Sequence, residues 1–339
     1  MTTRELGHSG LHLVPLVLGG NVFGWTADST TSFAVLDAFV AGGGNAIDTA
    51  DVYSAWAPGN EGGGQSETII GKWLKQRGRR DDVLILTKVG KLPIDGQKNL
   101  AKATIKKAVE ASLRRLQTDY IDLYQAHRYD YETPLEETMQ AFADVVRSGK
   151  ALYVGVSEWN AEQIRAGQEL ATQMGFRLVS NQPQYSMLWR VIEDQVVPTS
   201  KELGMGQVVW SPMAEGVLSG KYLPGSQPPA GSRATDEKGG REMIARWMTD
   251  PVLTAVQRLR PIAEQAGLTM AQLAVAWVLQ NDNVSAALVG ASRPEQLVEN
   301  VKASGVRLEQ DTLDAIDEAL GDVVERDPSL TRSPSRLED

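Results

Sequence analysis

The sequence predicts an α/β protein that folds as a single (β/α)8 TIM barrel preceded by an N-terminal β-hairpin. Short apolar segments alternate about eight times with segments of helical periodicity along the 339 residues. Uninterrupted apolar runs are typical of parallel strands that are covered on both faces by helices. Eight such units favour a closed barrel over an open sheet. Because composition does not shift, residues 1–324 are expected to form one barrel, and residues 325–339 a polar, flexible tail.

The elements follow in order from the N-terminus. Residues 4–13 (RELGHSGLHL) indicate a hairpin with its turn at residues 8–10. The eight strands are expected at residues 16–20, 46–50, 83–88, 121–127, 151–157, 177–182, 206–211 and 285–291. Helical periodicity marks residues 32–43, 66–76 and 102–117. A further helix is expected to begin with Thr133 as N-cap and Glu136 completing a capping box.

Two long loops, residues 54–65 and about 214–248, should rise from the C-terminal face of the barrel. Loops of this length in compact domains usually serve a function.

Composition excludes several classes of function. A net charge of −9 argues against a nucleic-acid partner and against anionic membrane surfaces. The N-terminus MTTRELGHSG has no apolar h-region, and no apolar segment has the length of a membrane span. The chain has no cysteine, so disulfides and thiolate chemistry are excluded, and its three histidines make a multi-His metal site unexpected. These features suit a cytoplasmic protein, and they leave the oligomeric state open.

Four polar residues lie at or just beyond the C-terminal ends of three predicted strands: Asp48, Tyr53, Lys88 and His127. A tyrosine hydroxyl titrates near ~10 and is a poor acid at neutral pH. A nearby lysine ammonium stabilises the phenolate, so we expect Lys88 to lower the pKa of Tyr53. Asp48 would keep Lys88 charged, and His127 would orient a substrate oxygen or share the proton. Together they can make a proton donor for carbonyl reduction.

Each of these residues has an ordinary interpretation when it is taken alone. Asp48 could cap a loop beside a packed Tyr53. Lys88 could be a surface lysine, and His127 could be a buried histidine with its hydrogen bonds satisfied. In a (β/α)8 barrel, however, the second, third and fourth strands are neighbours, so their C-terminal ends converge on one mouth. Joint placement there favours the catalytic interpretation.

A phosphate site is predicted after the eighth strand. The glycine runs at residues 42–44 and 62–64 lack the GxGxxG spacing of a dinucleotide fingerprint. Ser292 to Glu295 fit an S-x-x-E capping box, so a helix is expected to begin there. A helix N-terminus at this place in a barrel can bind an anion through its dipole and free N–H groups. The alternative is that Ser292 only caps its helix.

Seven motifs occur in the order found in the aldo-keto reductase superfamily. They are DTADVYS (48–54), LTKVG (86–90), IDLYQAHR (121–128), GVSEWN (155–160), SNQPQYS (180–186), VWSPMAEGVLSGKY (209–222) and VGASRPEQLVEN (289–300). Each motif is weak alone, but seven in order make the chain similar to this superfamily over residues 4–320. The resemblance is strongest to the branch of bacterial sugar and aldehyde reductases and potassium-channel β-subunits. It implies NADPH-dependent reduction of small aldehydes or ketones, with Tyr53 as general acid.

The resemblance also implies a set of cofactor contacts. Ser157 and Gln182 would hold the carboxamide, and Trp210 would stack on the nicotinamide ring. Lys221 and Arg233, in the second long loop, would bind phosphates. The other contacts would be Gly20, Asn21, Val22, Asp48, Ser211, Pro212, Met213, Ala214, Gly216, Gly290, Ser292, Arg293, Gln296, Glu299 and Asn300.

Two residues depart from the family pattern. Glu158 stands where many relatives carry an asparagine that helps to hold the carboxamide, so this contact would rest on Ser157 and Gln182. Glu215 places a negative charge near the expected phosphate contacts, and we expect its side chain to point to solvent.

The substrate pocket is expected to be walled by aromatic side chains, although each could instead pack in the core. The pocket residues are Phe23, Trp25, Tyr53, Trp56, His127 and Tyr129. The sequence does not identify the carbonyl substrate.

Two other functions are compatible with a barrel. One is a regulatory protein that resembles the channel β-subunits and binds cofactor with little turnover, although His127 argues against it because such subunits tend to lack this histidine. The other is a metal-dependent hydrolase or isomerase, which a single strand-end histidine disfavours.

Overall fold

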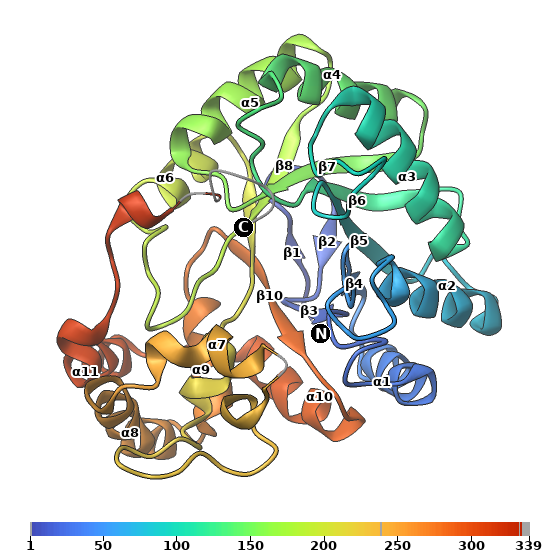
Figure 1. The fold of residues 1–339 in the computed structure, drawn as a ribbon. Coiled ribbons are helices and arrows are strands. Elements are labelled where there is room, and N and C mark those ends of the chain that lie inside the picture. Colours follow the sequence, from blue (N-terminus) through green and yellow to red (C-terminus); the bar gives the residue numbers. More distant parts are fainter. Residues whose placement is uncertain (1, 238, 332, 334–339) are drawn as a thin grey trace.

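A computed structural model describes residues 2–237, 239–331 and 333 of the chain (Figure 1). Eight parallel strands close into a barrel in the order β10-β3-β4-β5-β6-β7-β8-β9. They are β3 (Leu16–Gly19), β4 (Ala46–Asp48), β5 (Leu84–Val89), β6 (Ile121–Ala126), β7 (Ala151–Ser157), β8 (Leu178–Gln182), β9 (Gly206–Val209) and β10 (Val284–Gly290). The predicted (β/α)8 barrel is therefore confirmed.

Helices surround the ring of strands (Figure 1). They are α1 (Ser29–Ala41), α2 (Gln65–Arg77), α3 (Lys102–Leu116), α4 (Leu135–Arg147), α5 (Ala161–Gln173), α6 (Val196–Glu202), α7 (Gly240–Ile244), α8 (Asp250–Gln265), α9 (Met270–Val278), α10 (Pro294–Val301) and α11 (Gln310–Leu320). Their apolar stripes pack against the outward-facing strand residues in one large buried cluster. None of the helices formed by the described residues is long and apolar enough to cross a membrane.

The predicted hairpin closes the N-terminal end of the barrel. Its strands β1 (Arg4–Glu5) and β2 (His12–Leu13) pair antiparallel. Its apolar side chains join the inward-facing strand residues in a second buried cluster: Leu6, Leu11, Leu13, Val17, Ala46, Leu86, Leu123, Val179, Val208, Ala286 and Leu288. Side chains along a strand alternate between two faces. Asp48, Lys88 and His127 follow members of this cluster by even numbers of residues, so they face inward at the opposite end.

Two helix starts differ from the sequence predictions. Helix α1 begins at Ser29 because the Asp28 side chain accepts a hydrogen bond from the Thr31 N–H at 2.8 Å. Thr133 does not cap α4. Its own N–H donates to Asp130 Oδ1 at 3.3 Å, and Pro134 takes the cap position without a side-chain bond.

The described part of the C-terminal segment makes contacts with the barrel, in contrast to the expected flexible tail. The backbone of Glu325 hydrogen-bonds with the backbones of Leu188 and Arg190. Thr331 is buried, and Ser333 lies 1% exposed between two loops of the barrel mouth. There the Tyr129 N–H donates to Ser333 Oγ at 2.8 Å, and Ser333 Oγ donates to the Glu158 carbonyl oxygen at 3.1 Å. Residues 332 and 334–339 lie outside the described residues.

Candidate active site

Three of the four predicted catalytic side chains are joined by hydrogen bonds at the C-terminal mouth. Lys88 Nζ donates to Asp48 Oδ2 at 2.6 Å, to the Thr49 carbonyl oxygen at 2.7 Å and to Tyr53 Oη at 2.9 Å. The ammonium therefore uses all three of its donors. Tyr53 Oη lies 3.4 Å from Asp48 Oδ2. His127 completes the group, with its ring centroid 5.9 Å from that of Tyr53.

The strand ends hold these side chains in a buried environment. Lys88 and Asp48 are fully buried, and their ion pair is excluded from solvent. A buried charge is retained only when it is paired and hydrogen-bonded, which is the situation of both groups. Burial lowers the pKa of Lys88, but the charges and hydrogen bonds of Asp48 and Tyr53 outweigh it and raise the pKa above its ordinary value. Lys88 is therefore a fixed cation.

The expected lowering of the Tyr53 pKa is wrong in its net direction. Burial is the largest influence and raises the pKa of this hydroxyl; Lys88 opposes it, and the charge of Asp48 adds to the rise. Lys88 does favour the phenolate, but desolvation of the phenolate outweighs its effect. Tyr53 consequently keeps its proton throughout the neutral range, which is the form that a general acid needs.

His127 is a neutral imidazole. Burial lowers its pKa well below the ordinary value, and the charges of Lys88, Arg128 and Lys91 act in the same direction. Its Nδ1 is buried and has no hydrogen-bond partner among the described residues. A neutral imidazole carries one N–H donor. His127 can thus orient a substrate oxygen by hydrogen bonding.

Aromatic side chains from two loops lie against Tyr53. The Trp25 and Trp56 rings meet edge to face at a centroid distance of 5.7 Å, and Trp56 lies 6.1 Å from the Tyr53 ring. Trp56 is 46% exposed although it lies beside this buried site. These two tryptophans lie next to Tyr53, and their part in a substrate pocket stays a prediction.

Two other predicted pocket residues serve mainly in packing. Phe23 is fully buried in the core, where its carbonyl oxygen accepts a hydrogen bond from Ser54 Oγ at 2.7 Å. Its placement in an open pocket is therefore wrong. The Tyr129 ring packs between Tyr131 and Trp159, at centroid distances of 4.9 and 5.0 Å.

The loop after β4 is a series of tight turns rather than an open excursion. Backbone bonds connect Tyr53 to Ala50 and Asn60 to Ala57, and Asn60 Nδ2 donates to the Gly24 carbonyl oxygen at 2.8 Å. The loop is thus fastened to the loop after β3, which carries Trp25.

The exits of β3, β7 and β8 are linked to Asp48. Gln182 Nε2 donates to Asp48 Oδ1 at 2.8 Å, and Ser157 Oγ donates to the Gln182 carbonyl oxygen at 2.8 Å. Gly20 N donates to the Asp48 carbonyl oxygen at 2.7 Å. A Cβ on residue 20 would lie 2.9 Å from Ser66 Oγ, so glycine suits this position. Asn21 and Val22 follow as half-buried residues. Of the two residues predicted to bind the carboxamide, Gln182 therefore bonds to Asp48 itself, and Ser157 bonds to Gln182.

Glu158 has a role that the sequence analysis did not find. Its Oε1 accepts hydrogen bonds from Trp210 Nε1 at 2.7 Å and from Gln184 N at 2.6 Å. The carboxylate thus fixes the edge of the Trp210 indole and leaves its ring partly exposed at the mouth. The sequence signal was present, because Glu158 replaces an expected amide. The partner lies 52 residues away and could not be inferred.

The expectation that Glu215 points to solvent is wrong. Its side chain is buried and accepts hydrogen bonds from Trp247 Nε1 at 2.8 Å and Gln184 Nε2 at 3.1 Å. Burial raises its pKa, although these donors and nearby arginines oppose the rise. Arg233 Nη1 donates to the Glu215 carbonyl oxygen at 3.2 Å, and Lys221 is exposed nearby. Glu215 therefore connects parts of the second long loop to one another and to Gln184 through buried hydrogen bonds.

The backbone after β9 is strained. Ser211, Ala214 and Glu215 have φ values of 52°, 45° and 53°, and Gly216 follows at 101°. Non-glycine residues with such angles cost roughly 1–3 kcal/mol each and cluster at ligand sites and switches. Pro212 and Met213 lie within this segment. The strain coincides with the predicted nicotinamide and pyrophosphate contacts.

The predicted capping box after β10 does not form. Arg293 occupies the N-cap of α10 without a side-chain bond, and the Ser292 backbone N–H donates to Gln296 Oε1 at 2.9 Å. Pro294 at the first helical position explains the displaced start, since it suits N1 and lacks an N–H. Gly290 is exposed with open space beside it, and Asn300 is buried. The Glu299 side chain lies outside the described residues.

A buried polar cluster that the sequence did not reveal links α2, β5 and α3. Glu67 accepts from Thr87 Oγ1 and Arg115 Nε, each at 2.6 Å. It stands on the apolar stripe of α2, three residues before Ile70, and an acidic residue on such a stripe was the available signal. Asp51 is buried beside this cluster. Its pKa is raised well above the ordinary value, mainly by burial and further by Glu67.

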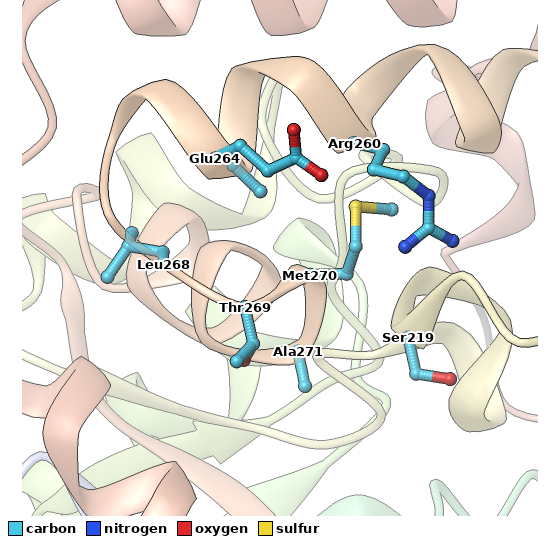
Figure 2. A pocket seen from close by; sticks show the side chains of 8 residues that line it. Ser219, Arg260, Glu264, Leu268, Thr269, Met270 and Ala271 are labelled. Atoms are coloured by element: carbon cyan, nitrogen blue, oxygen red, sulfur yellow. The ribbon is translucent and has the colours of Figure 1, made fainter.

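A separate pocket lies between α8 and α9 (Figure 2). Its volume is about 300 Å³, and its walls include Ser219, Arg260, Glu264 and Met270. It shares no residue with the catalytic group. Among the described residues, no cluster of three or more histidine and carboxylate side chains could hold a metal ion.

The fold and the site together define a (β/α)8-barrel protein with a hydrogen-bonded aspartate, lysine and tyrosine at its C-terminal mouth. The Aldo/keto reductase family model matches residues 15–320, and the chain belongs to this family of oxidoreductases. It is 37% identical to "Probable voltage-gated potassium channel subunit beta" of Oryza sativa subsp. japonica, covering 100% of this chain and 99% of the relative. It is 36% identical to "Uncharacterized oxidoreductase YrpG" of Bacillus subtilis (strain 168), over 92% of this chain and 94% of the relative.

Proposed function

We propose that this protein reduces aldehydes or ketones to alcohols with NADPH. The observation that carries the proposal is the ammonium of Lys88, which bridges Asp48 and Tyr53 inside the barrel mouth. A phenol held in this way is a pre-positioned proton donor. Family membership and the likeness to a bacterial oxidoreductase support the same conclusion.

Each residue has a defined part in the reaction. Tyr53 donates its hydroxyl proton to the oxygen on which negative charge develops. Lys88, kept charged by Asp48, stabilises the phenolate that remains. His127 donates a hydrogen bond to the same oxygen and fixes the carbonyl in place. When bound, NADPH supplies the hydride, and alcohol oxidation would use the same residues in reverse.

The residues of the barrel mouth fit a dinucleotide cofactor. Glu158 holds the Trp210 ring where it can stack, and the strained backbone at Ser211 leads into the loop with Lys221 and Arg233. Open space beside Gly290 adjoins the start of α10. Cations and a helix N-terminus suit phosphates.

A regulatory protein with little turnover is the second candidate, because three similar relatives are named as probable or putative potassium-channel β-subunits. The two functions are separated by a panel of aliphatic and aromatic carbonyls with NADPH oxidation as the readout. The reductase predicts turnover of at least one aldehyde. Binding of NADPH without turnover of any carbonyl would instead favour the regulator.

We predict that NADPH is preferred over NADH. Arg233, held against the Glu215 backbone, offers a planar cation to the 2′-phosphate. Arg233→Ala should raise the KM for NADPH more than the KM for NADH. Arg79→Ala, an exposed arginine on the other side of the barrel, is the matched control. Equal kcat/KM for both cofactors in the unmodified protein would contradict this prediction.

We predict that Trp56 selects the substrate. Trp56→Ala should change the ratio of kcat/KM for a bulky aromatic aldehyde over a small aliphatic one by roughly tenfold, because it removes one wall of the pocket. Trp56→Phe keeps an aromatic ring beside Trp25 and should change the ratio less. If both aldehydes lose activity equally, Trp56 does not read the substrate.

A further inference from the structure

Two cations leave neighbouring strand ends at the same height beside the catalytic group. Val89 of β5 pairs with Ala126 of β6, and the His127 N–H donates to the Val89 carbonyl oxygen at 2.9 Å. Lys91 and Arg128 each lie two residues beyond this pair. Parallel register therefore places them at one edge of the mouth. They follow closely on Lys88 and His127 along the chain.

Neither cation has a carboxylate partner among the residues that the structure describes. Within the described part of the chain, Lys91 makes no hydrogen bond or ion pair, and the Arg128 guanidinium bonds only to the His127 carbonyl oxygen, at 3.2 Å. Both side chains are half-buried. Several other half-buried or buried arginines do have a carboxylate partner, such as Arg80 with Asp122 at 2.5 Å and Arg115 with Glu67 at 2.6 Å. A partly buried, unpaired cation is costly and is typical of a binding site.

The two cations also act on each other and on the reaction centre. Burial lowers the pKa of Lys91 to about 8, and the charges of Arg128 and Lys98 contribute to this shift. The charge of Asp51 acts to raise the pKa of Lys91, but it is the smallest of these influences. The charges of Lys91 and Arg128 both act to lower the pKa of His127, and the charge of Arg128 also acts to lower the pKa of Tyr53. An anion placed between them would relieve their repulsion and lie beside the reacting carbonyl.

We propose that Lys91 and Arg128 form an anion subsite next to His127, so that the substrates are carbonyl compounds bearing a carboxylate or phosphate. The inference rests on the proposed reductase function and narrows its substrate class. A guanidinium binds either group through two parallel hydrogen bonds, and the lysine adds a point charge. In a protein of net charge −9, a local positive mouth would also attract such substrates selectively.

The test compares aldehydes that differ in charge. We would measure kcat/KM for 4-carboxybenzaldehyde and 4-formylphenyl phosphate, each relative to 4-nitrobenzaldehyde, whose nitro group is neutral but planar like a carboxylate. Lys91→Met and Arg128→Met should each lower at least one anionic-to-neutral ratio by about tenfold, since charge-assisted hydrogen bonds are lost. Intrinsic reactivity cancels because the same aldehydes are compared in every variant. The ratio that falls identifies carboxylate or phosphate as the group recognised.

Two controls address charge and geometry. Lys72→Met removes one exposed cation from α2 and should leave the ratios unchanged. Arg128→Lys keeps the charge but loses the planar guanidinium. Its anionic-to-neutral ratio of kcat/KM should therefore lie between those of the unmodified protein and Arg128→Met.

A binding measurement separates this inference from the proposed function. Calorimetry should show tighter binding of 4-carboxybenzyl alcohol or its phosphate counterpart, 4-(hydroxymethyl)phenyl phosphate, than of 4-nitrobenzyl alcohol, with the preference reduced in Lys91→Met. Reduction of neutral aldehydes with ratios unchanged in both methionine variants would overturn the subsite and leave the reductase standing. Preferential anion binding without any carbonyl turnover would overturn the reductase and leave the subsite.

Discussion

Tyr53→Phe should reduce kcat for carbonyl reduction by about 10²–10⁴, the usual contribution of a general acid. The variant lacks only the hydroxyl that accepts a hydrogen bond from Lys88 at 2.9 Å, so the ring contacts with Trp56 and His127 can remain. NADPH affinity should stay within a few-fold of the unmodified protein, because the hydroxyl bonds to Lys88 and Asp48. The measurement is steady-state reduction with a parallel cofactor titration.

Tyr120→Phe is the matched control for this prediction. It removes a hydroxyl at the N-terminal end of β6, where the ring lies under the Arg80 guanidinium, and it should retain full activity. A Tyr53→Phe variant that kept more than half of the kcat would show that Tyr53 is not the proton donor.

The pH dependence of reduction follows from the pKa directions at the site. Tyr53 acts in its protonated form, and its pKa is raised, chiefly by burial. Activity should therefore be lost only as pH rises through this raised pKa, leaving kcat flat from about pH 6 to about pH 9. His127, with a lowered pKa, adds no loss near its ordinary value.

Lys88→Met should also abolish most of the activity. The cation lowers the pKa of Tyr53 and stabilises its phenolate, so the variant has a weaker acid. It also leaves Asp48 buried without its ion partner, and breaking such a pair typically costs about 3–5 kcal/mol of stability. Thermal unfolding must accordingly be measured together with kcat.

A double variant separates catalysis from folding. Lys88→Met/Asp48→Asn removes both charges, so much of the thermal stability should return while kcat stays low. Lys72→Met, on the surface of α2, should change neither quantity. Should kcat recover together with stability in the double variant, Lys88 would be a structural residue and not a catalytic one.

The barrel and the convergence of the catalytic group could be predicted because both depend on local patterns. Short apolar segments that alternate with helical periodicity predicted the eight strands. Because Asp48, Lys88 and His127 lie at the ends of neighbouring strands, they were expected to meet. The resemblance to a known family added the cofactor contacts, which remain predictions.

The remaining features depend on contacts between loops that are distant in the sequence. The bond from Gln182 to Asp48 spans 134 residues, and the bond from Trp210 to Glu158 spans 52. The burial of Glu215 depends on Trp247, which no local pattern indicates. The direction in which the Tyr53 pKa shifts could not be predicted for a similar reason, because desolvation depends on the whole surrounding structure.

The transfer of deuterium from labelled NADPH tests the central claim most directly. The protein would be incubated with NADPH carrying deuterium at the transferable position and with an aldehyde from the panel, and the alcohol would be analysed by mass spectrometry. We predict one deuterium on the carbinol carbon for each NADPH oxidised, and almost no deuterated alcohol with Tyr53→Phe. Alcohol without deuterium, or bound NADPH that yields no alcohol with any carbonyl, would contradict it.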